Sequence, residues 1–338
     1  ITNISVKEYL GQEVVPDSGC GSWLWEPQST NLITYSEDFS VTPFSSNTIL
    51  YTSNTTETLS PSGDNTSDKF EVTASNSDAH RRFTRNISLQ SFTLSVYVKG
   101  ESGQKFQLFL ARDSYAEILD IDTTLSGEWE RIVLSGAFST ISSSVVIGCE
   151  FGFGSSDSVA GQIYYLWGAQ LEQQSYATSY IPTNGEANGV TRNQDLCTNG
   201  GSLASINSTS GTLYAEIAAL SNDLTDRDIS LSDGTNNNVV RIRFSRFSNN
   251  IGYAVLSNGV ATVGALVSGQ TQTNTNKIAV KYKQDNFALW INGVEVATDT
   301  SGNTPIGLSS LQFTTGNVAL PFFGKTKAVA VWKEALSD

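Results

Sequence analysis

The chain has 338 residues and a formal net charge of −13, from 33 acidic and 20 basic residues. This charge argues against a nucleic-acid-binding surface, because phosphate binding requires a basic one. No stretch approaches the roughly 18 apolar residues of a membrane span, so we expect neither nucleic acid nor membrane insertion. Only 16% of the residues are charged, and the abundance of Ser, Thr, Asn and Gly suits strands with polar, uncharged outer faces.

The first 30 residues are interpreted as the end of a preceding β-domain plus a connector. Residues 1–9 (ITNISVKEY) alternate between apolar and polar positions and then give way to polar sequence. In the segment WLWEPQ, Pro27 disfavours a helical conformation for the residue before it. Trp23 and Trp25 are therefore expected to pack against a neighbouring module in a hinge, with stacking on a ligand as the alternative.

Residues 31–182 contain apolar runs of period two, which predict β-strands. The runs are separated by turn-forming segments such as SPSGDNTS and KGESGQ. In QIYYLWGAQLE, the alternation predicts that Trp167 faces the core and Tyr164 faces outward. Strands of this length and spacing predict a sandwich of two packed sheets, and in SFTLSVYVKG the inward face is expected to consist of Phe92, Leu94, Val96 and Val98.

Residues 183–211 are rich in Gly, Asn, Ser and Thr and are interpreted as an extended linker. Alternation resumes over residues 212–338, where Asn292-Gly293 is a strong signal for a two-residue hairpin turn. The sequence thus predicts an all-β protein with two tandem antiparallel β-sandwiches, or jelly rolls, joined by a linker. The chain contains no Met, and we interpret it as a piece of a longer polypeptide whose second sandwich is truncated at its C-terminus.

The residues that could carry catalysis do not form a recognisable pattern. Glycoside hydrolysis requires two carboxylates placed across a sugar ring, and Glu117, Asp120 and Asp122 lack the clustered arrangement of known glucanases. The single histidine, His80, is accompanied by no nucleophile-elbow sequence. Cys149 lies on an apolar strand face and is expected to be a core residue. We therefore predict a non-enzymatic protein that requires no cofactor.

Several phrases resemble a module pair of bacteriophage tail-fibre and other virion surface proteins, namely LWEPQSTNLITYSEDFS and WGAQLEQQSYATSYIPTNGEANGVTRNQD. Residues 31–182 resemble galactose-binding-like jelly rolls of the carbohydrate-binding-module type. KIAVKYKQDNFALWINGVEVA and VAVWKEALSD are similar to concanavalin A-like (laminin G-like) lectin domains. The resemblance implies a location on the virion surface, outside the cell, and a homo-oligomer, with a trimer expected. It also implies contacts with other virion proteins and adhesive binding of a host-surface polysaccharide or other glycan.

Two other functions remain open at this point: a purely structural virion spacer or decoration module, and a polysaccharide-degrading enzyme. For the binding function, the candidates are outward-facing aromatic residues and nearby cations, because aromatic rings stack on the C–H faces of sugars. Arg241, Arg243 and Arg246 are expected to form a solvated face. Jelly rolls of the first type often carry a structural calcium, and the resemblance places Glu37, Asp38 and Glu172 at its position. The carbohydrate-binding candidates are Tyr97, Arg82, Arg112, Tyr115 and Trp290.

Overall fold

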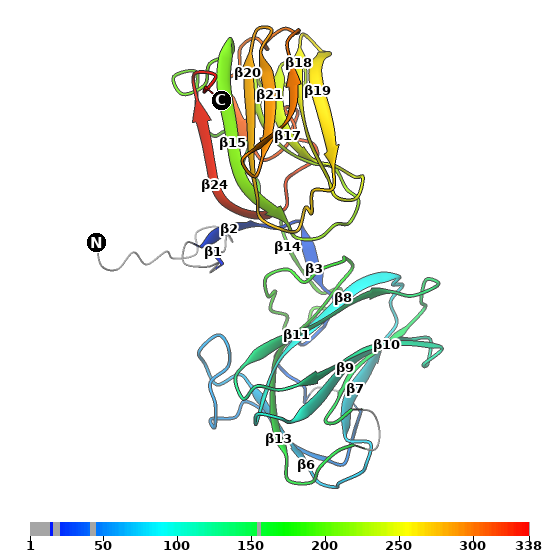
Figure 1. The fold of residues 1–338 in the computed structure, drawn as a ribbon. Coiled ribbons are helices and arrows are strands. Elements are labelled where there is room, and N and C mark those ends of the chain that lie inside the picture. Colours follow the sequence, from blue (N-terminus) through cyan, green and yellow to red (C-terminus); the bar gives the residue numbers. More distant parts are fainter. Residues whose placement is uncertain (1–13, 16–20, 41–44, 154–156, 338) are drawn as a thin grey trace, which may run out of the picture. The chain divides into compact units, whose positions relative to one another are not determined.

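The computed structural model describes residues 14–15, 21–40, 45–153 and 157–337. In these residues the fold is all-β, as predicted, and the strand pairs are antiparallel (Figure 1). The contacts divide the chain into two units. We call Gln28–Asn193 the first sandwich, and the described residues up to Pro27 together with those from Gln194 onward the second sandwich. Among the residues that the structure describes, no helix is long and apolar enough to cross a membrane.

The first sandwich consists of two five-stranded sheets with the orders β10-β9-β12-β7-β4 and β11-β8-β13-β6-β5, and a two-stranded pair β14-β3. Its core is formed by side chains from both five-stranded sheets, with Phe70, Phe92 and Phe106 fully buried. The strands are β3 (Ser29–Asn31), β4 (Ser45–Asn47), β5 (Ile49–Thr52), β6 (Asp68–Val72), β7 (His80–Arg85), β8 (Ser91–Gly100), β9 (Lys105–Arg112), β10 (Glu117–Thr124), β11 (Glu130–Ala137), β12 (Val145–Glu150), β13 (Ile163–Glu172) and β14 (Val190–Arg192).

The predicted alternation is confirmed in β8 but is wrong for the first half of β13. In β8, the predicted inward residues all belong to the core. In β13, Tyr164 is fully buried in the core, whereas Trp167 packs outside it against Tyr97, with 5.4 Å between the ring centroids. The register of β13 against β8 shifts between Trp167 and Gln170. Such a bulge moves the following residues to the opposite face, and Leu171 accordingly returns to the core.

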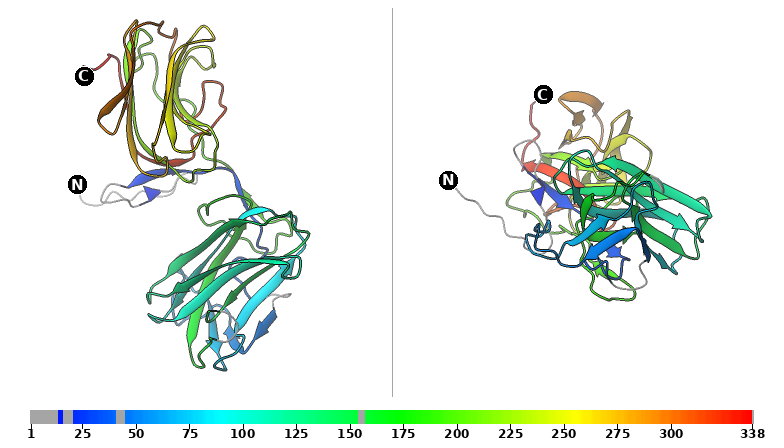
Figure 2. Two further views of the ribbon diagram at one scale, coloured as in Figure 1. Left: turned by 45° about the vertical axis from the view of Figure 1, so that its right-hand side comes forward. Right: turned by 90° about the horizontal axis from the view of Figure 1, so that it is seen from below.

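The second sandwich pairs a seven-stranded sheet, β1-β2-β24-β15-β20-β21-β22, with a five-stranded sheet, β19-β18-β17-β16-β23. Figure 2 shows these sheets as two layers, and the apolar residues of both enclose one core. The strands are β1 (Val14–Val15), β2 (Ser22–Trp25), β15 (Ser210–Ala219), β16 (Arg227–Ser232), β17 (Val239–Phe244), β18 (Asn250–Ser257), β19 (Val260–Ser268), β20 (Asn276–Lys283), β21 (Phe287–Ile291), β22 (Val294–Asp299), β23 (Ser310–Gln312) and β24 (Gly324–Trp332).

The predicted hairpin turn at Asn292-Gly293 is present between β21 and β22. Ile291 pairs with Val294, and Asn292 and Gly293 have φ angles of 52° and 83°. A two-residue hairpin turn with positive φ at both central positions matches the twist of the flanking strands. The turn therefore fixes the register of β21, the strand that carries Trp290.

The structure places Ser22–Trp25 in the sheet of the second sandwich, and not in a connector as the sequence indicated. Trp23 pairs with Thr326 and Trp25 with Gly324 of β24. Trp25 is 7% exposed and stacks on Phe313 at a centroid distance of 4.4 Å, whereas Trp23 is 48% exposed. Residues 1–9, interpreted as the closing strand of a preceding domain, lie outside the described residues.

The segment interpreted as a linker, residues 183–211, is likewise part of the folded units. Val190–Arg192 forms β14, which pairs with β3 of the first sandwich. In the second sandwich, the Asp195 carboxylate accepts a hydrogen bond from the Glu26 amide at 2.9 Å, and the Cys197 carbonyl accepts one from the Phe313 amide at 2.8 Å. A polar segment rich in Gly, Asn, Ser and Thr has the composition of a linker. Here, however, its hydrogen-bonding groups pair with residues of the first sandwich and then of the second.

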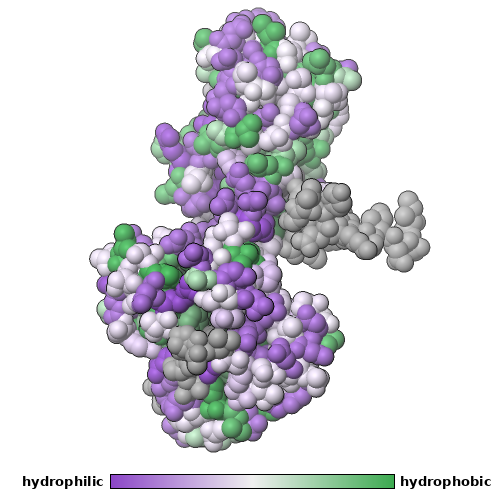
Figure 3. All heavy atoms as spheres, turned by 180° about the vertical axis from the view of Figure 1, so that it is seen from behind, coloured by the Kyte–Doolittle hydropathy of each residue, from purple (hydrophilic) through white to green (hydrophobic). Residues whose placement is uncertain are grey.

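The surface carries interspersed polar and apolar residues. The face seen in Figure 3 is mostly hydrophilic, with small apolar patches over both units. This is the usual appearance of a folded protein surface, so a binding site has to be located from local geometry.

Candidate functional site

Two of the predicted sugar-binding residues, Arg82 and Tyr115, meet in the first sandwich. The Arg82 guanidinium carbon lies 5.6 Å from the centroid of the Tyr115 ring, which is 6.3 Å from the centroid of Phe109. Tyr115 is 41% exposed and lies in the turn between β9 and β10. Phe109 itself is buried, so the exposed part of this cluster is the Tyr115 ring with the Arg82 cation over it.

Arg112 has a different role from the one predicted, because its guanidinium holds this turn in place. Its Nε donates to Glu117 Oε2 at 2.8 Å, and its Nη1 donates to Asp113 Oδ2 at 3.1 Å. Asp113 also accepts hydrogen bonds from the Ser143 amide and hydroxyl, both at 2.8 Å, and from the Ser144 amide. These hydrogen bonds, of which the one from the Ser143 amide has the largest effect, lower the pKa of Asp113 to about 2. Arg112 therefore positions Tyr115 and has little donor capacity left for a ligand.

Tyr97 lies on the other sheet of the first sandwich and is not brought together with Arg82 and Tyr115. It is half-buried, with Arg131 at 5.4 Å over its ring and Trp167 at its edge. Tyr180 packs on Trp167 at a centroid distance of 4.4 Å. The Arg131 guanidinium donates to the Thr178 carbonyl at 2.7 Å. The segment that follows β13 thus packs over Tyr97, which restricts access to its ring.

The predicted calcium ligands do not form one site. Glu172 is fully buried, and its carboxylate accepts hydrogen bonds from the Ser29 hydroxyl at 2.5 Å and the Thr178 amide at 3.0 Å. Glu37 accepts from the Tyr180 hydroxyl, and Asp38 accepts from its neighbour Ser40. The described part of the chain contains no group of three or more His, Cys, Asp or Glu side chains that could hold a metal ion. Glu172 and Glu37 instead join distant chain segments by hydrogen bonds, whereas Asp38 bonds locally to Ser40.

The acidic residues considered for catalysis lie on β10. The Gln107 amide donates to Asp120 Oδ2 at 3.2 Å and to Asp122 Oδ1 at 2.8 Å. Glu117 binds Arg112 and the Ser139 amide, and its pKa is lowered, chiefly by the Arg112 hydrogen bond. A carboxyl group that serves as a general acid requires a raised pKa. The lowered pKa of Glu117 is the opposite of what that role requires.

The remaining predicted residue, Trp290, lies on the outer face of the seven-stranded sheet of the second sandwich. Ala279 of β20 pairs with Trp290 on one side and with Tyr214 of β15 on the other. The three residues therefore form a row across neighbouring strands, in which an alanine separates two aromatic side chains. Strands in a sheet lie about 4.8 Å apart, so the backbones that carry the two aromatics are about 10 Å apart.

This row lies in a pocket of about 330 Å³, which we call the Trp290 groove. Lys277 and Lys281 flank Ala279 on the same face of β20, because residues two apart on a strand share a face. At one end, the C-terminal segment is held to β15 by a hydrogen bond from the Leu336 amide to Thr212 Oγ1 at 3.1 Å. The groove is lined by Thr212, Tyr214, Lys277, Ala279, Lys281, Trp290, Gly293, Leu336 and Ser337.

Tyr214 was not among the predicted site residues, although the sequence contains a signal for it. In GTLYAEIAAL, Leu213 and Ala215 are inward and fully buried, which leaves Tyr214 on the outer face. Burial raises the pKa of Tyr214, and its hydroxyl donates to Glu216 at 3.4 Å. The sequence alone could not connect Tyr214 with Trp290, because this requires knowing that β15 and β21 lie on either side of β20 in the sheet.

No protein-family model and no curated protein matches the chain. Solved structures that match include a family 61 carbohydrate-binding module in complex with β-1,4-galactotriose, with 12% identity over 43% of this chain and 99% of that one, and a TM-score of 0.31. Domains LG4–5 of the mouse laminin α1 chain match with 8% identity, 78% and 89% coverage and a TM-score of 0.30. A truncated AlyQ with a CBM32 and an alginate lyase domain matches with 11% identity, 86% and 98% coverage and a TM-score of 0.26. A functional assignment therefore depends on the residues of this chain.

Proposed function

We propose that this chain is a non-enzymatic, glycan-binding segment of a virion surface protein, and that the Trp290 groove is its binding site. The observation that carries the proposal is the row of Tyr214, Ala279 and Trp290 in one pocket. A pyranose ring has apolar C–H faces and a rim of hydroxyls. The aromatic side chains provide surfaces for the faces, and the methyl group of Ala279 leaves room for the ring between them.

The polar residues of the groove complement the hydroxyl groups of a sugar. Lys277 is exposed beside Ala279, and its ammonium group can donate up to three hydrogen bonds. Because the residues project from paired strands, their backbones are fixed before the ligand arrives. Preorganisation of this kind reduces the entropy lost on binding.

The groove suits weak binding that is strengthened by repetition. Its volume of about 330 Å³ is at the lower end of the range for small-molecule sites, about 300–1,000 Å³, which fits a short stretch of a glycan. Several copies on one particle would convert later binding events into intramolecular ones and raise the avidity. A homotrimer on a virion and a repetitive host-surface polysaccharide, both expected from the sequence resemblance, supply such copies; the solution mass of the chain tests the trimer.

The binding proposal is tested by screening the whole chain on a glycan array and then titrating the best oligosaccharide into wild type, Trp290→Ala and Trp23→Ala. Trp23 is the matched control, because it is an exposed tryptophan of the same sheet that does not line the groove. We expect Trp290→Ala to weaken binding about tenfold or more, as for a buried aromatic at the centre of an interface. Trp23→Ala is expected to bind like wild type.

Two outcomes contradict the proposal, and they differ in meaning. Equal affinities of the three proteins would place the sugar elsewhere on the molecule. No binding by wild type to any glycan would reject the adhesive function and favour the structural spacer. Circular dichroism and thermal unfolding of each variant show whether it is folded.

A further inference from the structure

The five-stranded sheet of the second sandwich has a pocket of about 370 Å³ on its outer face, which the proposed function does not use. We call it the arginine pocket. Arg241 and Arg243 project from β17 into its lining, Arg246 and Phe247 follow at the end of that strand, and Asp226 lies beside them. The floor on β18 and β19 combines the small residues Gly252, Ala254 and Gly264 with the side chain of Leu266.

The register of the strands produces this contrast between long and short side chains. Arg243 pairs with Gly252, and Arg241 pairs with Ala254, which in turn pairs with Gly264. A Cβ atom on Gly252 would lie 2.4 Å from the Ala265 carbonyl oxygen, so the backbone there has no room for a side chain. Guanidinium groups thus stand beside the small residues Ala254 and Gly264, and Leu266, whose Cδ1 would lie 3.1 Å from a Cβ on Gly252, adds an apolar surface for a sugar ring.

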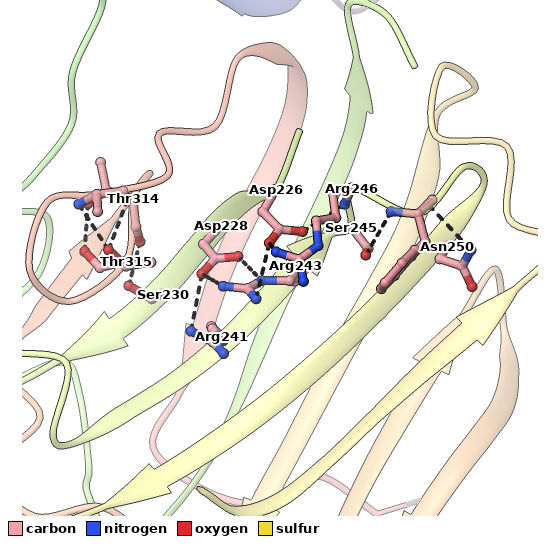
Figure 4. A network of polar contacts seen from close by, with 12 residues as sticks. Asp226, Asp228, Ser230, Arg241, Arg243, Ser245, Arg246, Asn250, Thr314 and Thr315 are labelled. Atoms are coloured by element: carbon pink, nitrogen blue, oxygen red, sulfur yellow. Dashed lines mark hydrogen bonds and ion pairs between the residues drawn. The ribbon is translucent and has the colours of Figure 1, made fainter. Parts of the chain in front are cut away.

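Two aspartates hold the arginines in position, as Figure 4 shows. Asp228 is fully buried, and its two carboxylate oxygens accept hydrogen bonds from Arg243 Nε at 2.7 Å and Nη2 at 2.8 Å. Arg241 Nη1 lies 3.5 Å from Asp228 Oδ2. Asp226 Oδ2 lies 3.6 Å from Arg243 Nη1 and 4.0 Å from Arg246 Nη1.

The aspartates do not neutralise the cluster. Three guanidinium groups face two carboxylates, which leaves one positive charge in excess, in a protein whose net charge is −13. The Arg246 side chain is 66% exposed, with only the 4.0 Å contact to Asp226 among the ion pairs of the described residues. The Nε of Arg241 is buried and has no hydrogen-bond partner in the described part of the chain. The pocket therefore offers the exposed Arg246 guanidinium and an excess positive charge, both of which attract anions.

We propose that the arginine pocket is a second site, which binds the carboxylate of an acidic sugar such as a uronate. The planar fork of a guanidinium matches a carboxylate in a bidentate arrangement. Phe247 is 56% exposed at the rim, with the Arg246 guanidinium 5.5 Å from its ring centroid, and it offers a face for the sugar ring. The inference deepens the proposed function by naming an acidic glycan as the ligand class, but it rests on residues on the other sheet from the Trp290 groove.

The probe is trigalacturonate, and its fully methyl-esterified form is the neutral comparison. Both are titrated into the whole chain by calorimetry at about 0.01 M and about 0.15 M salt, where the screening length differs about fourfold. We expect wild type to prefer the acid over the ester by about tenfold, as for loss of a charge-assisted hydrogen bond, and to bind the acid more weakly at the higher salt concentration.

The principal variant is Arg246→Gln, because Arg243→Gln would leave the buried Asp228 without its main partner and could prevent folding. A second variant, Ala254→Leu, fills the floor without changing any charge. Both are expected to weaken binding of the acid about tenfold. The matched control is Lys283→Gln, which removes one exposed positive charge of the other sheet and is expected to change binding less than about twofold.

The inference would be overturned if Lys283→Gln weakened binding of the acid as much as Arg246→Gln does. It would also be overturned if wild type bound the acid and the ester equally, or if it bound no acid at the low salt concentration. The variant Trp290→Ala separates this inference from the proposed function. Whatever share of the affinity it removes, the remaining binding should keep its preference for the acid over the ester, because that preference comes from the arginine pocket. If Trp290→Ala abolishes binding of trigalacturonate while Arg246→Gln has no effect, the Trp290 groove alone binds sugar and the second site is rejected.

Discussion

Replacing Trp25 with alanine is expected to destabilise the second sandwich. Trp25 lies near the N-terminal end of the sequence, whereas most of this sandwich is formed by residues from Gln194 onward. Its side chain is 7% exposed, belongs to the core of that sandwich and stacks on Phe313 at 4.4 Å with 23° between the ring planes. Trp-to-Ala changes in cores cost about 3–5 kcal/mol. The indole N–H has no hydrogen-bond partner among the described residues, and its removal relieves part of this cost. We therefore expect a loss of about 3 kcal/mol in the free energy of unfolding.

Differential scanning calorimetry of the whole chain measures this effect. For a domain of 150–250 residues, 1 kcal/mol corresponds to about 2–4 °C, so one transition should move down by about 6–12 °C. Trp23→Ala is the control, because Trp23 occupies the same strand but is 48% exposed; it should change stability by less than about 0.5 kcal/mol. A Phe70→Ala variant, which removes a core residue of the first sandwich, identifies the other transition.

Similar shifts for Trp25→Ala and Trp23→Ala would refute the reasoning, since both would then behave as residues of a connector. A shift of the same transition by Trp25→Ala and Phe70→Ala would also contradict it, because the two residues belong to different cores.

Two further predictions concern single ionisable groups. Burial raises the pKa of the Cys149 thiol to about 12, so iodoacetamide at pH 8 should alkylate Cys149 far more slowly in the folded than in the urea-unfolded chain, as measured by mass spectrometry; equal rates would show that the thiol is accessible. The pKa of Asp113 is lowered to about 2, below the ordinary value of about 3.9. Its stabilising contribution is therefore complete above about pH 4 and is lost as the pH falls through about 2. A carboxyl-carbon NMR titration should show the inflection near 2, and an inflection near 4 would mean that the bonds to Ser143 and Ser144 are not formed.

The sequence contained enough information for the strands and for the outward position of Trp290, a residue of the proposed site. Period-two alternation determined the inward face of β8, and Asn292-Gly293 determined the hairpin that places Trp290 on the outer face. Both features are local, since the side-chain period and the turn geometry depend on neighbouring residues only.

Features that depend on distant pairing could not be predicted. The partner of Ser22–Trp25 is β24, about 300 residues later, and nothing in a four-residue strand identifies it. The bulge after Trp167 exchanged the two faces of β13, because one extra residue inverts an alternation. Arg241, Arg243 and Arg246 were expected to form a solvated face, but only Arg246 is largely exposed. Arg241 and Arg243 are held by Asp228, a buried residue of the neighbouring strand β16.

The central claim is that the second sandwich binds sugar between two aromatic side chains, and a crystal structure of the chain with its best oligosaccharide tests it most directly. The account predicts a pyranose ring in the Trp290 groove, in contact with the rings of Trp290 and Tyr214 and lying over Ala279. A saccharide bound in another place with these rings unoccupied, or one cleaved between two carboxylates, would contradict it.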